Sequence, residues 1–134
     1  MKRLIIAASL VSAVLLVSSS PVRADSQTFT MTAENGSSES GTVTLTPILG
    51  GTRVHIKLDN QPAGAIQPAH IHVGGCPGVG AVKYPLKDVV FGHSTTIIKG
   101  VPPDQIVGWS GGYAVNVHNA KDDMKTYVSC ANIR

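Results

Sequence analysis

The sequence has few charged residues and no excess of either sign once its first segment is set aside. Charged side chains make up 14% of the 134 residues, and three of the eleven basic ones, Lys2, Arg3 and Arg23, lie within the first 24 positions. The remainder carries eight basic and eight acidic side chains, so its net charge is near zero. A domain without a basic surface is a poor partner for nucleic acid or an anionic membrane, and we expect it to bind neither.

Long hydrophobic runs are also missing after the first segment, so we expect no transmembrane span. At the start, two basic residues precede an apolar run over 4–17, and Val22 and Ala24 are small residues of the kind that a signal peptidase reads. The run is short for a bilayer, and a retained membrane anchor is the alternative. We therefore interpret residues 1–24 as a signal peptide and 25–134 as one domain exported to the periplasm or outside the cell.

Cysteine is scarce, with only Cys76 and Cys130 in the whole sequence. A thiolate metal site needs closely spaced pairs of cysteines, which are lacking here. An exported protein lies in an oxidising compartment, where two cysteines in one small domain favour a disulfide. We predict a Cys76–Cys130 bridge, with thiolate metal ligands as the weaker alternative.

No segment shows a sustained 3.6-residue apolar period, whereas alternation of apolar and polar residues recurs throughout residues 25–134. Phe29 and Met31 alternate with threonines, and Val54 and Ile56 alternate with basic residues, as in strands with one buried face. We expect an all-β domain, a Greek-key β-sandwich or flattened barrel of about eight antiparallel strands with one disulfide. The expected strands cover residues 28–33, 42–46, 53–58, 69–73, 86–90, 94–99, 113–118 and 127–133.

Histidines occur on two of these expected strands. His70 and His72 are two positions apart and therefore project from the same face, while Ile71 faces the other way. On the later strand, Asn116 and His118 share a face in the same manner. Three imidazoles from two strands can form a trigonal nitrogen site, which suits copper, particularly Cu(I), or zinc with a fourth ligand.

The two remaining histidines differ in their surroundings. His93 lies in a Gly-His-Ser turn, and we consider it a candidate fourth ligand. His55 is flanked at alternate positions by Arg53 and Lys57, which indicates an ordinary solvated strand face.

These motifs resemble those of the Cu,Zn superoxide dismutase superfamily. Ala69-His70-Ile71-His72 is similar to the first copper-ligand pair of that family, and Val117-His118 to its later copper ligand. Cys76 and Cys130 are similar to its intrasubunit disulfide. Residues 127–133, Tyr-Val-Ser-Cys-Ala-Asn-Ile, take the place of its C-terminal motif, so the resemblance covers most of the domain.

The sequence departs from that family at two points. No histidine lies between Cys76 and Val90, where the family carries its bridging histidine and further zinc ligands, and Asp88 is the only acidic residue there. Tyr127 stands where the family has the arginine that guides superoxide to copper. The resemblance therefore implies one copper ion at His70, His72 and His118, no zinc, and no catalytic residue that we can name.

Chordin-type (CHRD) domains are also similar, through the Ala-His-Ile-His-x-Gly and Val-Asn-Val-His patterns. Two functions follow from these resemblances. The first is an exported copper-binding protein of the dismutase-like fold, with superoxide as a candidate substrate and at most weak dismutase activity. The alternative is a non-enzymatic extracellular or envelope module without a functional metal. The sequence leaves enzymatic activity, oligomeric state and protein partners open.

Overall fold

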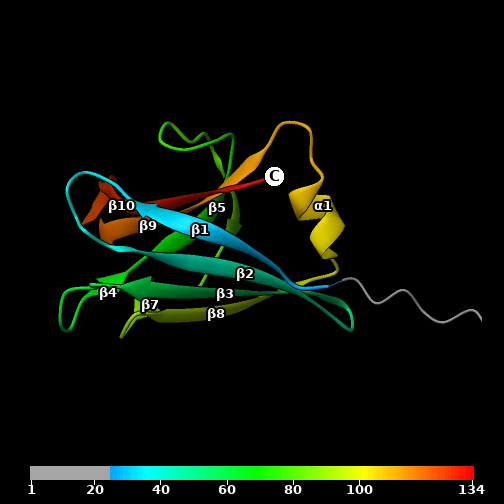
Figure 1. The fold of residues 1–134 in the computed structure, drawn as a ribbon, viewed down its shortest axis with the longest axis horizontal. Helices are drawn as coiled ribbons and strands as arrows, with labels where there is room; N and C mark the ends of the chain where they lie inside the picture. The colour runs from blue at the N-terminus through cyan, green and yellow to red at the C-terminus, as the bar shows by residue number, and fades with distance from the viewer. Residues whose placement is uncertain (1–24) are drawn as a thin grey trace, which may run out of the picture.

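The computed structural model describes residues 25–134, and the expected signal peptide at 1–24 lies outside them. Strands dominate the described chain, with one five-residue helix (Figure 1). The expected all-β class is confirmed. The elements are β1 (Gln27–Ala33), β2 (Ser40–Ile48), β3 (Gly51–Asp59), β4 (Ile66–Gln67), β5 (Ala69–Val73), β6 (Val82–Pro85), β7 (Val89–Val90), β8 (His93–Lys99), α1 (Pro103–Val107), β9 (Tyr113–Ala120) and β10 (Asp123–Ile133).

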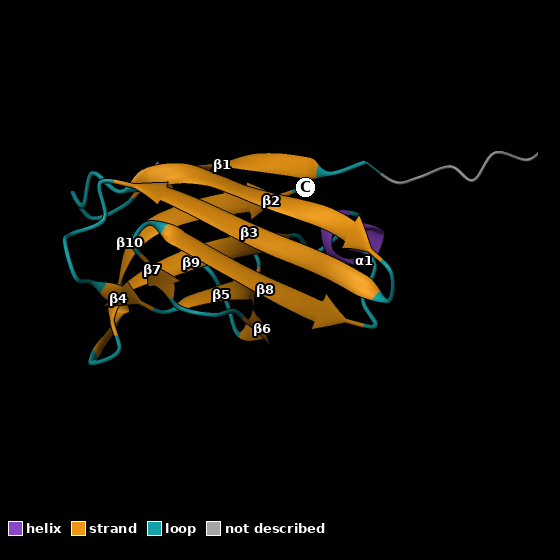
Figure 2. Cartoon of the chain, turned by 90° about the horizontal axis from the view of Figure 1, so that it is seen from below, coloured by secondary structure: helices purple, strands orange, loops and turns teal. Residues whose placement is uncertain are grey.

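The strands form one antiparallel sheet in the order β4-β7-β8-β3-β2-β1-β10-β9-β5-β6, which curls back on itself. Figure 2 shows β1, β2, β3 and β8 in one layer, with β10, β9, β5 and β6 behind them. Strand β1 joins the layers because it pairs with β2 on one side and with β10 on the other. Pro68 links β4 to β5, and its carbonyl accepts a hydrogen bond from the backbone N–H of His118 at 2.8 Å. The result is a flattened barrel.

The core lies between the two layers and is filled by the apolar residues that alternate along each strand. In β5 and β9, the rows Ala69/Val117 and Ile71/Val115 pair across the strands and point into this core. The intervening residues of both strands must therefore face away from the core, because successive side chains alternate. This alternation sends the histidines to the opposite face.

Four small elements differ from the sequence-based expectations. Of the strand expected over 86–90, only the last two residues form a strand, β7. Strand β6 lies before that range, at Val82–Pro85, and β4 spans only two residues. Helix α1 begins with a proline at its first turn, where the missing N–H costs nothing, and buries Ile106. Five residues are too few to show a helical period, so this helix is not recognisable from periodicity.

The predicted disulfide between Cys76 and Cys130 is confirmed, with Cα atoms 6.0 Å apart. Cys130 lies in β10 on the face away from the core, in register with Asn116 of β9. Cys76 lies in the segment that follows β5, which we call the β5–β6 loop (74–81). The bridge therefore fixes this loop against the same face of the sheet that carries the histidines.

Candidate metal centre

His70, His72 and His118 converge on the face of the sheet that is turned away from the core. The first two come from β5 and the third from β9, and one nitrogen of each lies within 4.8 Å of those of the other two. The ring centroids are 4.9 Å apart for His70 and His118, and 5.7 Å apart for His72 and His118. His72 and His118 are only 4% and 3% exposed, whereas His70 is partly open to solvent. The three histidines predicted from the sequence as metal ligands thus lie together in the structure.

Two backbone carbonyls orient the rings. His72 Nδ1 donates to the carbonyl oxygen of Gly80 at 2.9 Å, and His118 Nδ1 donates to that of Met124 at 2.7 Å. A carbonyl can only accept, so in the neutral rings each Nδ1 carries the proton and each Nε2 keeps its lone pair. Outer hydrogen bonds of this kind set the tautomer and the orientation of histidine ligands in metal sites.

The free nitrogens face one another. His70 Nδ1 lies 2.9 Å from His118 Nε2, so in the metal-free protein His70 donates its proton to that lone pair. His72 Nε2 is buried and has no hydrogen-bond partner among residues 25–134. The donor set is therefore His70 Nδ1, His72 Nε2 and His118 Nε2.

This donor set fits a metal ion of the first transition row. Metal–nitrogen bonds of about 2.0 Å in a trigonal arrangement place the nitrogens about 3.5 Å apart, so the His70–His118 contact must widen by roughly half an ångström. The partly exposed ring of His70 can supply that movement. Buried, unpartnered His72 Nε2 gains a partner in the process, which removes the cost of an unsatisfied polar atom.

Electrostatics favour the neutral form that a metal requires. Burial lowers the pKa of His70, and the neighbouring His118 and His72 lower it further, while Asp88 opposes the shift. Burial likewise lowers the pKa of His118; the hydrogen bond to Met124 acts against this, and His72 adds to the lowering. Both imidazoles therefore lose their protons more readily than a free histidine does and are ready to bind a cation.

These shifts predict a pH dependence for the metal-free protein. A histidine whose pKa is lower in the folded state binds more protons when unfolded, so its contribution to stability is complete above about pH 6.5 and is lost as the pH falls toward the folded-state pKa. We expect the free energy of unfolding, measured by urea titration, to fall between pH 7 and pH 5. His70→Gln should flatten this slope, whereas exposed His93→Gln should not. An unchanged slope in His70→Gln would contradict the assignment.

The other polar groups near the site carry both signs of charge. Asp88, which acts on His70, forms an ion pair with Lys121 at 3.1 Å. The Tyr127 ring centroid lies 5.0 Å from that of His118. Arg134 follows the C-terminal end of β10, and its guanidinium lies beside Gly75, 3.2 Å from where a Cβ on that glycine would be.

The structure does not bring His93 to this group. It lies at the start of β8 and stacks on His55 of β3, with ring centroids 5.7 Å apart, in the other layer of the barrel. His55 also bonds Thr95 Oγ1 through Nδ1 at 2.9 Å and is a surface residue, as expected. His93, the candidate fourth ligand, is therefore in the layer that does not carry the three-histidine group, because β8 pairs with β3 and not with β5 or β9.

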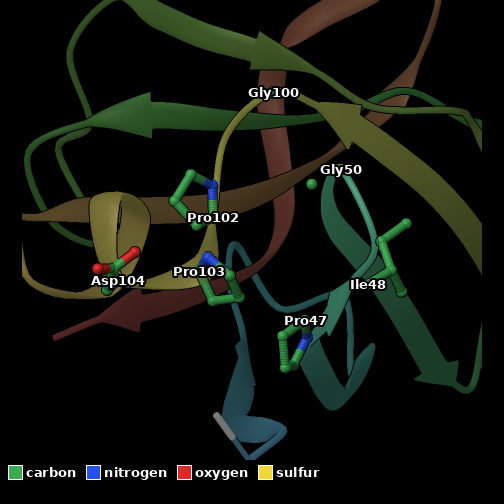
Figure 3. Close-up of a pocket in the computed structure, with 8 residues that line it drawn as sticks. Pro47, Ile48, Gly50, Gly100, Pro102, Pro103 and Asp104 are labelled. Carbon is green, nitrogen blue, oxygen red and sulfur yellow. The ribbon is translucent and has the colours of Figure 1, made fainter. Parts of the chain in front are cut away.

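Other hollows and clusters in the described chain do not form a comparable site. Glu34 lies near both cysteine sulfurs, but those are joined in the disulfide and cannot act as thiolates. The cavity in Figure 3, about 490 Å³, lies between the β2–β3 turn and α1 and is lined mainly by prolines and glycines. It is at the α1 end of the barrel, whereas His118 meets Pro68 next to β4, at the opposite end (Figure 1).

In comparisons with known proteins, no protein-family model, no curated protein and no solved structure matches the chain. Within residues 25–134, no helix is long and apolar enough to cross a membrane.

Proposed function

We propose that this protein is an exported copper-binding protein with a dismutase-like β-sandwich and one copper site formed by His70, His72 and His118. The observation that carries the proposal is the convergence of three imidazole nitrogens from two adjacent strands, one of them buried without a partner. Apolar side chains at this place would make the fold more stable, since burying unpaired polar atoms lowers the free energy of unfolding. A bound metal ion would give the buried, unpartnered Nε2 of His72 a bonding partner.

Copper is the metal that this donor set suits best. The group contains three neutral nitrogen ligands and neither a carboxylate nor a thiolate. Three imidazoles complete a trigonal shell for Cu(I), whereas structural zinc takes four protein ligands. Copper also stands above zinc in the general order of affinities of divalent ions for nitrogen sites. A second group of histidines and carboxylates, from which a zinc site could be built, does not occur in the described part of the chain.

The proposed role is binding, storage or delivery of copper, with at most weak dismutation of superoxide. The bridging histidine and the guiding arginine of the resembling family have no counterparts at the corresponding positions. Export is supported by the disulfide, which persists in oxidising compartments, together with the expected signal peptide.

Metal analysis tests this proposal. The domain spanning residues 25–134, purified from an export compartment and dialysed against equal copper and zinc, should retain about one copper and little zinc per chain. His70→Ala and His118→Ala should each weaken copper binding by at least about 100-fold, because each removes one of three ligands that the protein orients. His55→Ala, a surface histidine of the other layer, is the matched control and should bind as the wild type does. Equal retention of both metals, or loss in His55→Ala alone, would contradict the site.

One observation favours the second candidate, a chordin-type module without a functional metal. His70 and His118 already satisfy each other through a 2.9 Å hydrogen bond that needs no ion. The same dialysis decides between the two, since a module of this kind retains neither metal.

A further inference from the structure

Asn116 is the one member of the histidine-bearing face that no structural contact explains. It lies in the middle of β9, is 0% exposed, and neither its Oδ1 nor its Nδ2 has a hydrogen-bond partner among the described residues. Its neighbours along the strand, Val115 and Val117, fill the core on the other side. A leucine of similar size would avoid the free-energy cost of burying an unpaired amide. The asparagine is therefore best explained by a hydrogen-bond partner that is not part of the described chain.

The strand register places Asn116 within the metal centre. It pairs directly with His70, so the two side chains stand next to each other on the same face. His72 pairs with Ala114, two positions before Asn116, and His118 follows two positions after it. The row of Asn116 and His70 therefore lies midway between the other two histidines.

The rings of those two histidines lean toward each other over this row. Four residues along a strand cover about 13 Å, yet the ring centroids of His72 and His118 are only 5.7 Å apart. The carbonyls of Gly80 and Met124 hold the far sides of the same rings. The buried amide of Asn116 thus lies on the same face as the three histidines, in the strand row between His72 and His118.

We propose that the Asn116 carboxamide hydrogen-bonds a small oxygen or nitrogen ligand, such as water or a small anion, at the fourth coordination position of Cu(II). This inference rests on the proposed copper site. Three nitrogens suffice for Cu(I), whereas Cu(II) prefers a four-coordinate tetragonal shell. An amide offers a donor and an acceptor, so it can hold either a water molecule or an anion. Asn116 is a positioning residue that favours the oxidised ion.

Asn116→Leu tests this with azide as the probe ligand. The variant should bind Cu(I) within about threefold of the wild type, because it keeps all three histidines. Its Cu(II) affinity should fall at least tenfold, its Cu(II) paramagnetic resonance spectrum should change, and azide should bind at least tenfold more weakly. Gln27→Leu, which replaces an exposed amide at the start of β1, is the control and should leave all three readouts unchanged.

Thermal unfolding of the metal-free proteins separates this role from a structural one. Asn116→Leu should melt at or above the wild-type temperature, since it removes an unpaired buried amide. Asn116→Ser, which keeps a hydrogen-bonding group, should retain part of the azide binding. Asn116→Ala takes the place of the leucine variant if that one does not fold. Wild-type Cu(II) spectra and azide binding in Asn116→Leu, or in Asn116→Ala where the leucine variant does not fold, would overturn the inference while leaving the copper site intact. A wild type that takes up no copper would overturn both.

Discussion

Replacing Cys76 or Cys130 with serine should lower the free energy of unfolding by about 2–5 kcal/mol. The bridge joins residues 54 positions apart, so it removes a large closed loop from the unfolded ensemble, an effect of about 4 kcal/mol by loop-closure entropy. Urea titration of the oxidised wild type and of each variant measures the difference. Reduction of the wild type should reproduce the loss seen in the variants.

The same substitution should weaken copper binding although neither cysteine is a ligand. Cys76 holds the β5–β6 loop, and Gly80 of that loop accepts the Nδ1 proton of His72. Losing an outer hydrogen bond of this kind typically costs 10–100-fold in metal affinity, by the general behaviour of such partners. Copper competition at a temperature where the variants are folded measures this effect. Two titratable thiols in the unreduced, unfolded wild type would contradict the bridge, and unchanged stability in both variants would contradict its role.

The long strands of the fold could be read from the sequence, and the short elements could not. Residues such as Val54, Ile56 and Leu58 alternate with polar neighbours over a whole strand, which leaves a clear two-residue period. Strand β4 has two residues and helix α1 has five, so neither completes enough repeats to be recognised. Their positions are set by tertiary contacts, as in the burial of Ile106 at one end of the barrel.

The site shows the same division. The His-x-His spacing was enough to put His70 and His72 on one face, and the disulfide followed from the cysteines and the expected compartment. The contribution of Gly80 is a backbone carbonyl, which leaves no mark in a sequence. The layer that holds His93 depends on which strands pair, and periodicity does not specify pairing. The two-residue period places Asn116 on the face of His118, but only its burial without a partner marks it as part of the site.

The copper-loaded protein should dismute superoxide at least about 100-fold more slowly than the diffusional limit, with a rate that hardly changes with ionic strength. Anion steering requires a local excess of positive charge, and the groups near the site do not supply one. Lys121 is neutralised by its 3.1 Å ion pair with Asp88, and Lys125 is near Asp122 and Asp123 in the same hairpin. Tyr127 lies beside His118 and His72, and a phenol side chain offers a hydrogen bond but no positive charge.

Tyr127→Arg is the variant that isolates this electrostatic deficit. A guanidinium beside the histidines should raise the rate several-fold at low salt, and the gain should disappear as salt screens the new charge, because the screening length shrinks from about 30 Å at 0.01 M to about 8 Å at 0.15 M. Ile97→Arg adds the same charge at an exposed position of β8, in the other layer, and should change little. Pulse radiolysis of the copper form at two ionic strengths provides the rates. A wild-type rate near the diffusional limit that falls steeply with salt would mean that a cation already present guides the anion, and Lys125 would then be the first residue to replace.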